Sequence, residues 1–148
     1  MTRLSLDEYY LAMLDLVASR ATCRRRQVAA ILTDAKGVLI STGYNGVPSG
    51  MPHCIDAPCR GATDQAGNND SCLAIHAEQN CLLRAGDRLR RAHTLYCSTV
   101  PCFNCAKLVV SAGIKRVVAA SIYADQRGLE LLRQAGVEMT IMKETDVS

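Results

Sequence analysis

The stretch "PCFNCAKLVVSAGIKRVVAAS", residues 101–121, decides the fold. It predicts a helix over 101–114, because Pro101 suits a first helical position and Gly113 suits the residue that ends a helix. The apolar run "RVVAAS" then predicts a buried strand over 116–121. A helix followed at once by a buried strand is typical of sheets built from parallel strands and crossover helices.

The flanking segments continue this alternation. Their apolar spacing predicts a helix over 5–20, strands over 28–33 and 38–43 with the turn "DAKG" between them, a helix over 75–84, a strand over 93–98, a helix over 125–135 and a strand over 137–142. The first two strands are expected to be antiparallel and the later ones parallel. We therefore predict an α/β fold of three α/β/α layers around a mixed five-stranded sheet, in a single domain over residues 1–148.

Composition narrows the class of protein. Of the 148 residues, 49% are hydrophobic and 21% are charged, which is typical of a globular domain. No apolar run approaches the roughly 20 residues that span a membrane, and Asp7, Glu8 and Asp15 lie where a signal peptide would be apolar. We expect a cytoplasmic protein with no membrane partner.

The net charge of +3 permits an anionic small substrate and argues little for nucleic acid. Basic residues gather at 24–26 and at Arg84, Arg88, Arg90 and Arg91. Runs of charge are usually solvated faces, and we interpret both clusters in that way.

Two of the 8 cysteines form the motif "PCFNC". Cys102 and Cys105 are three residues apart at the start of a predicted helix, so both sulfurs can reach one metal ion. The helix dipole at that place favours thiolates. Without a secretion signal, cysteines favour metal binding or catalysis over disulfides, although one CxxC alone also fits a redox pair.

The stretch "AIHAEQN", residues 74–80, supplies a third ligand and a base. Positions two apart inside a helix point about 200° apart. His76 and Glu78 can therefore face one pocket only if the helix begins near His76. Three protein ligands leave one tetrahedral position open for water, which marks a catalytic zinc site. Asn80 is expected to point back toward the loop before the helix.

The pattern His-X-Glu followed by Pro-Cys-X-X-Cys is the signature of zinc-dependent nucleobase deaminases. Three other interpretations remain open. The histidine and the cysteine pair can be ordinary core residues, the CxxC can be a redox pair that needs no metal, or the chain can be a non-catalytic zinc module. A non-catalytic module predicts closed four-ligand sites, whereas this set offers three ligands and a carboxylate.

The segments "STGYNGVPSGMPHC" (41–54), "HAEQN" (76–80) and "PCFNCAKLVVSAGIKRVV" (101–118), together with Tyr123, resemble the deoxycytidylate deaminase family of the cytidine deaminase-like superfamily. The resemblance covers residues 20–141. It implies zinc-dependent hydrolysis of dCMP to dUMP and ammonia, which feeds thymidylate synthesis. It also implies a homohexamer, activation by dCTP with Mg2+ and inhibition by dTTP.

The resemblance implies a role for each residue of the signature. His76, Cys102 and Cys105 would hold the Zn2+ ion, and Glu78 would shuttle protons to and from the substrate. The backbone N–H groups of Ala77 and Cys102 would orient the reacting centre, because helix starts carry free donors.

A second set of residues would bind the nucleotide. Asn45, on a loop flanked by glycines, would hydrogen-bond the sugar. Tyr123 would lie over the substrate or near its phosphate, and Arg26, or alternatively Arg25, would bind the phosphate. Asn45 also fits the simpler interpretation of an asparagine that stabilises a turn.

Residues 44–72 show no periodicity, and loops of such length are usually functional or tied down. Four cysteines lie in or beside this segment: Cys23, Cys54, Cys59 and Cys72. Four thiolates would form a closed structural zinc site that orders the loop, and a second zinc is implied by the resemblance as well. His53 can replace one of these ligands, and a set of ordinary reduced cysteines is the alternative.

The substrate stays open within this enzyme class. Besides dCMP, a deaminase of this type can act on another cytosine nucleotide or nucleoside, or on an adenosine in tRNA. A tRNA editor should show a basic face beside an open groove. The mild charge and the "GYNG" loop favour a small nucleotide, so nucleic acid is not the expected partner.

Overall fold

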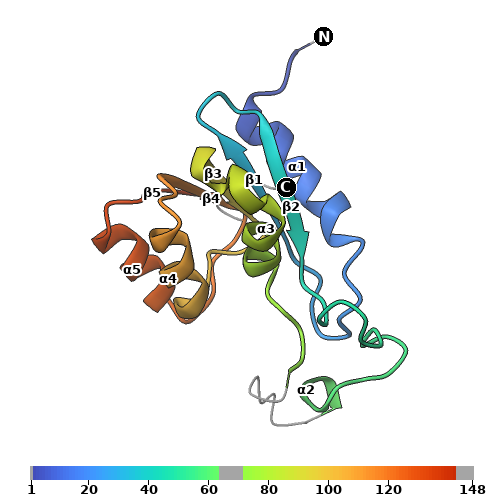
Figure 1. Cartoon of the computed structure of the whole chain (residues 1–148). Helices are drawn as coiled ribbons and strands as arrows, with labels where there is room; N and C mark the ends of the chain where they lie inside the picture. Colours follow the sequence, from blue (N-terminus) through green and yellow to red (C-terminus); the bar gives the residue numbers. More distant parts are fainter. Residues whose placement is uncertain (1, 64–71, 143–148) are drawn as a thin grey trace.

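The computed structural model describes residues 2–63 and 72–142 (Figure 1). Its elements are α1 (Leu6–Ala18), β1 (Ala29–Asp34), β2 (Leu39–Tyr44), α2 (Arg60–Thr63), α3 (Ala77–Ala85), the 3-10 helix η2 (Gly86–Arg91), β3 (Ala92–Cys97), α4 (Phe103–Ser111), β4 (Arg116–Ala119), α5 (Arg127–Gln134) and β5 (Glu138–Ile141). Except for α2 and η2, each corresponds to an element expected from the sequence.

The five strands form one sheet in the order β2-β1-β3-β4-β5. β1 runs antiparallel to both β2 and β3, whereas β3, β4 and β5 are mutually parallel neighbours. This confirms the predicted mixed five-stranded sheet. The parallel half brings the carboxyl ends of β3 and β4 to the same edge, which is where open α/β sheets place their ligand sites.

Helices cover both faces of the sheet (Figure 1). On one face, Tyr10 and Leu14 of α1 pack against Ile31, Tyr96 and Val118. The other face carries α3, α4 and α5, whose buried residues join the strands in one larger cluster, which includes Ala77, Cys81, Ala106, Val109, Leu129 and Leu132. The predicted three-layer α/β/α arrangement is therefore confirmed.

The sequence predicted the C-terminal end of α4 correctly but not its N-terminal end. The predicted glycine stop is confirmed, because Gly113 follows α4 with a φ of 79°. The predicted start at Pro101 is wrong by two residues. Cys102 is extended, with φ −64° and ψ 171°, and caps the helix that begins at Phe103. The motif thus places its first sulfur at the cap itself.

The long segment predicted as loop contains one short helix, α2, and is closed at its base. Gly46 and Ile75 form an isolated antiparallel bridge, with N···O distances of 3.2 and 2.8 Å. This bridge joins the residue after Asn45 to the residue before His76. Residues 64–71 of the segment lie outside the described residues.

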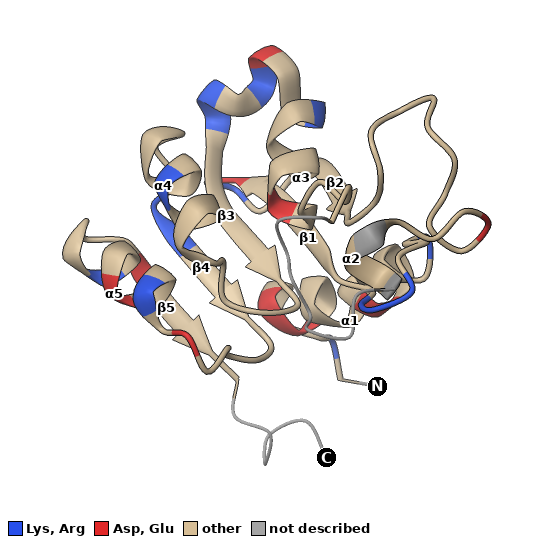
Figure 2. Ribbon diagram, turned by 90° about the horizontal axis from the view of Figure 1, so that it is seen from below, with Lys and Arg blue, Asp and Glu red and all other residues tan. Residues whose placement is uncertain are grey.

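A cluster of charged residues lies at the C-terminal end of α3, in its last turn and in η2. Arg84, Arg88, Arg90 and Arg91 are exposed, as the sequence predicted for a solvated cluster. Figure 2 shows this basic run at the turn between α3 and β3. Within the ranges 2–63 and 72–142, no helix has the length and apolar character needed to cross a membrane.

Candidate active site

The start of α3 sets two functional side chains in one pocket. His76 is the N-cap of α3, with φ −68° and ψ 153°, so the helix begins at the next residue. This confirms the prediction drawn from the His76–Glu78 spacing. The His76 N–H donates to Gln79 Oε1 at 2.9 Å, and Asn80 Nδ2 donates to the Tyr44 carbonyl at 2.9 Å. Asn80 therefore ties α3 to the end of β2, as expected.

His76, Cys102 and Cys105 form a compact ligand set. His76 Nδ1 lies 3.5 Å from Cys102 Sγ and 3.3 Å from Cys105 Sγ. Among the described residues, this is the only set of three potential ligands whose donor atoms all lie within 4.8 Å of one another. Bonds of about 2.0 Å to nitrogen and 2.3 Å to sulfur in a tetrahedral zinc site separate the two donors by about 3.5 Å. Both the chemistry and the spacing fit zinc.

The pKa values of the two thiols are shifted in opposite directions. A hydrogen bond from the Cys105 thiol lowers the pKa of Cys102 to about 4. The same bond raises the pKa of Cys105 above its ordinary value. The neighbouring Cys102 raises the pKa of His76. A bound zinc ion would take both cysteines as thiolates and the histidine as neutral imidazole.

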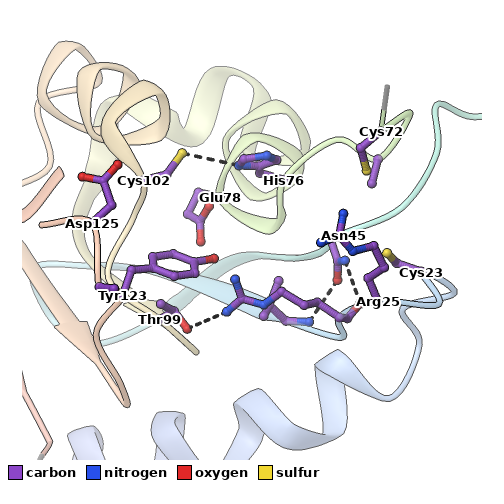
Figure 3. Close-up of a pocket in the computed structure, with 14 residues that line it drawn as sticks. Cys23, Arg25, Asn45, Cys72, His76, Glu78, Thr99, Cys102, Tyr123 and Asp125 are labelled. Carbon is purple, nitrogen blue, oxygen red and sulfur yellow. Dashed lines mark hydrogen bonds between the residues drawn. The ribbon is translucent and has the colours of Figure 1, made fainter. Parts of the chain in front are cut away.

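Glu78 lies beside the ligand set, more buried than His76 and Cys102, and is only 8% exposed. Figure 3 shows its carboxylate between His76 and Tyr123. Burial raises the pKa of the Glu78 carboxyl above its ordinary value. A raised pKa brings the protonated and ionised forms closer in free energy at neutral pH, and a carboxyl that both takes and gives protons needs that balance.

A cavity of about 530 Å3 opens beside this centre, a volume within the range of small-molecule sites. Residues from five separate parts of the chain line it: Cys23, Arg25, Arg26, Val28, Asn45, Cys72, Ala74, His76, Glu78, Thr99, Cys102, Tyr123, Ala124 and Asp125. The cavity therefore brings together most residues that the sequence predicted for the site. Cys105 and Ala77 are fully buried beneath it.

Arg26 provides the cavity with a fixed positive charge. Its guanidinium carbon lies 4.4 Å from the centre of the Tyr123 ring, which is a cation–π contact. Its Nη2 donates to Thr99 Oγ1 at 3.2 Å. Arg25 is held differently, because its Nη1 donates to the Gly61 carbonyl at 3.0 Å. No sequence motif indicated that Thr99 would contact Arg26.

Asn45 lies in the cavity wall and is 6% exposed. Its Nδ2 donates to the Arg26 carbonyl at 2.9 Å, and its Oδ1 accepts from the Val28 N–H at 2.9 Å. These bonds favour the interpretation in which Asn45 holds the backbone around residues 26–28. The side-chain oxygen and nitrogen of Asn45 each keep one further hydrogen-bonding position. A hydrogen bond from Asn45 to the substrate sugar stays a prediction.

The four remaining loop cysteines surround a second, much smaller cavity. Cys23, Cys54, Cys59 and Cys72 all line this space of about 10 Å3, which is close to the room taken by one water molecule. His53 points its Nδ1 to Thr22 Oγ1 at 3.0 Å instead. Cys23 and Cys72 also line the large cavity, so the two spaces share a wall.

Two glycines, Gly43 and Gly128, allow the site helices to approach closely. A β-carbon on Gly43 of β2 would collide with the Ala77 carbonyl and the Cys81 N–H of α3. A β-carbon on Gly128 of α5 would collide with the Pro101 carbonyl, next to Cys102. A glycine inside a strand is a general signal of such close approach, and Gly43 carries that signal.

Sequence relatives share this region. Residues 4–121 match the family model of the cytidine and deoxycytidylate deaminase zinc-binding region. The deoxycytidylate deaminase of Saccharomyces cerevisiae is 38% identical over 138 residues, which cover 91% of this chain. The deoxycytidylate deaminase of Mycobacterium phage D29 is 36% identical over 124 residues, covering 80% of this chain and 96% of the phage protein.

The extent of these matches differs. The chain spans 44% of the length of the Saccharomyces cerevisiae relative. A solved structure of similar size is the dCMP deaminase from the cyanophage S-TIM5 in complex with dCMP and dUMP. It superposes with a TM-score of 0.75 at 27% identity, covering 96% of this chain and 100% of that chain.

Proposed function

Because the chain belongs to the deoxycytidylate deaminase family, we propose that it hydrolyses dCMP to dUMP and ammonia with zinc as its cofactor. One observation carries this proposal: the buried Glu78 faces a nucleotide-sized cavity beside the His76, Cys102 and Cys105 ligand set. The 36% identity to a phage deoxycytidylate deaminase over 96% of its length supports it.

His76, Cys102 and Cys105 would hold the zinc ion. When bound there, zinc supplies a Lewis acid that lowers the pKa of water toward about 7. The chain contributes the orientation of these ligands. His76 is the N-cap of α3 and Cys102 is the N-cap of α4, so the two side chains meet at the N-terminal ends of these helices.

Glu78 would carry protons through the reaction. As a carboxylate it takes a proton from the attacking water and delivers it to N3 of the cytosine ring, while the water oxygen bonds to C4. It then transfers the second proton of that water to the amino group, the C4–N bond breaks, and ammonia leaves. The products are dUMP and ammonia, and Glu78 ends in its starting state.

The nucleotide would lie along the large cavity. Arg26 would bind the phosphate, with Arg25 as the alternative, and Tyr123 would lie beside the same group. Asn45 would reach the sugar through its free hydrogen-bonding positions. The backbone N–H groups of Ala77 and Cys102 would orient the reacting centre from the two helix starts.

The four-cysteine cavity would hold a second, structural Zn2+. Its support is that Cys23, Cys54, Cys59 and Cys72 all line one small cavity, although no three of their sulfurs lie within 4.8 Å of one another in the described part of the chain. Four thiolates satisfy a tetrahedral ion completely, which suits a structural rather than a catalytic role. The metal would tie the chain around Cys23 to the loop that follows β2.

We further propose a single deaminase domain over residues 1–148 that works as a homohexamer in the cytoplasm, within pyrimidine metabolism. dCTP with Mg2+ and dTTP would act as effectors, and Mg2+ would serve only with dCTP. Large exposed apolar side chains support an assembly, since Leu16 of α1 is 73% exposed and Leu83 of α3 is 71% exposed.

The second candidate is the same chemistry on another cytosine nucleotide, a nucleoside or a tRNA adenosine. The placement of most basic residues argues against tRNA. The cluster at Arg84 and η2 lies beyond the C-terminal end of α3, and of the described basic residues only Arg25 and Arg26 line the cavity at its N-terminal end. A tRNA editor needs its basic face beside the groove.

The test is ammonia release by the purified protein from dCMP, deoxycytidine, CMP and cytosine, each with and without dCTP and Mg2+. The zinc content of the same sample is measured in parallel. The proposal expects release from dCMP well above the other three and two zinc ions per chain. Release from none of the four by zinc-loaded protein would contradict it.

A further inference from the structure

We propose that the hydroxyl groups of Thr99 and Ser121 position the Arg26 guanidinium, and so determine how strongly the site prefers a nucleotide over a nucleoside. This inference rests on the proposed function of Arg26 in binding the substrate phosphate. It adds two residues for which neither the motifs nor the family resemblance suggested a role.

The parallel sheet places the two hydroxyls opposite each other. Cys97 and Ala119 are paired at the ends of β3 and β4. Thr99 and Ser121 each follow two residues later, so they emerge side by side at the carboxyl edge of the sheet. Their oxygens lie 3.0 Å apart. Thr99 is 7% exposed and lines the cavity, and Ser121 supports it from behind.

Hydrogen counting fixes the direction of this chain of bonds. Ser121 has one hydroxyl hydrogen, and it donates that hydrogen to the Ser98 carbonyl at 2.9 Å. The bond between the two hydroxyls therefore uses the hydrogen of Thr99. Thr99 is left with only lone pairs to offer, and Arg26 Nη2 donates to them at 3.2 Å. Such an aligned chain strengthens each of its bonds.

The result is a guanidinium held on two sides. The Tyr123 ring lies 4.4 Å from the guanidinium carbon of Arg26, and the bond from Nη2 to Thr99 limits the rotation of the group. Binding to a phosphate uses two parallel N–H donors, so the rotation decides whether both can engage. A guanidinium that is already oriented loses less freedom when the phosphate binds.

The matched experiment compares Thr99→Val with Thr99→Ser. Valine keeps the shape of threonine and removes the acceptor, whereas serine keeps the acceptor. Affinities of the zinc-loaded proteins for dUMP and for deoxyuridine are measured by calorimetry, without turnover. We expect Thr99→Val to lower the affinity for dUMP by about tenfold, because a hydrogen bond to a charged group is lost. The loss for deoxyuridine should be much smaller, and Thr99→Ser should restore dUMP binding.

Two further variants separate positioning from a general loss of packing. Thr94→Val makes the same change at a threonine of β3 that is 5% exposed and does not line the cavity, so dUMP binding should stay normal. In an Arg26→Met background, Thr99→Val should have almost no further effect on dUMP, since Thr99 acts through Arg26.

The outcomes distinguish this inference from the proposed function. Unchanged dUMP affinity in Thr99→Val, or an equal loss for dUMP and deoxyuridine, would overturn the positioning role while leaving the proposed function intact. Equal affinities of the unaltered protein for dUMP and deoxyuridine would contradict both.

Discussion

Gly43 of β2 and Ala77 of α3 meet backbone to backbone, with no room for a β-carbon between them. This contact sets how closely α3 approaches the sheet. Since α3 begins with His76 and carries Glu78 in its first turn, the same contact sets the depth of the ligand and the base. The geometry of the catalytic centre therefore depends on a glycine outside the His-X-Glu and Pro-Cys-X-X-Cys motifs.

Replacement of Gly43 by alanine should push α3 away from β2. We expect a loss of 1–3 kcal/mol in the free energy of unfolding, typical of an overpacked core, and a lower zinc content after dialysis. The control is Gly46→Ala, because a β-carbon on Gly46 meets nothing within 4 Å. Denaturant unfolding and metal analysis of both variants check the prediction, and equal behaviour of the two would contradict it.

Arg26 is expected to select the phosphate through its planar fork. Arg26→Lys keeps the charge but loses both the stacking on Tyr123 and the paired donors. We expect the KM for dCMP to rise by about tenfold. Arg24→Lys is the matched control, because Arg24 bonds the Ile55 carbonyl and does not line the cavity. Similar KM values for the two variants would exclude Arg26 as the phosphate ligand.

The four-cysteine cavity predicts a specific zinc stoichiometry. Cys54→Ala should lower the zinc content from two ions per chain to one and lower the melting temperature, because the loop loses its cross-link. Cys81→Ala removes a different buried thiol, one whose sulfur contacts Ser41, and should leave both ions in place. Two ions retained in Cys54→Ala would argue for ordinary reduced cysteines.

Asp7 predicts a pH dependence of stability that is separate from the metal sites. The Arg116 guanidinium donates to both Asp7 oxygens at 2.9 and 2.6 Å, and it holds the pKa of Asp7 below its ordinary value of 3.8. Because the folded-state pKa is depressed, the pair stabilises the fold above pH 3.8. That contribution is lost as the pH falls through the folded-state pKa.

Asp7→Asn should therefore lower the free energy of unfolding at pH 7 by about 1 kcal/mol, since solvent screens a partly exposed pair. The difference from the unaltered protein should shrink as the pH falls below 3.8. Asp15→Asn, at an exposed position of the same helix, should show no such trend. Chemical unfolding across this pH range decides the matter, and a constant difference would refute the assignment.

Local sequence pattern was sufficient to predict the mixed sheet and the grouping of His76, Cys102 and Cys105. The alternation of helices and strands predicted the directions of the strands, and the His76–Glu78 spacing predicted where α3 starts. Local pattern could not predict contacts that depend on register. Thr99 faces Ser121 because β3 and β4 pair in parallel, and Asn45 bonds the backbone near Arg26 because β2 lies beside β1. Pro101 misled the prediction because the cap residue after it is extended.

Glu78 is the residue on which the mechanism depends most. The decisive measurement is the rate of ammonia release from dCMP by Glu78→Gln, compared with unaltered protein of equal zinc content. Glu130→Gln, an exposed change on α5, serves as the control. We expect Glu78→Gln to keep its zinc and its affinity for dUMP but to lose turnover by about 10²–10⁴-fold. Normal turnover in that variant would show that Glu78 does not carry the protons.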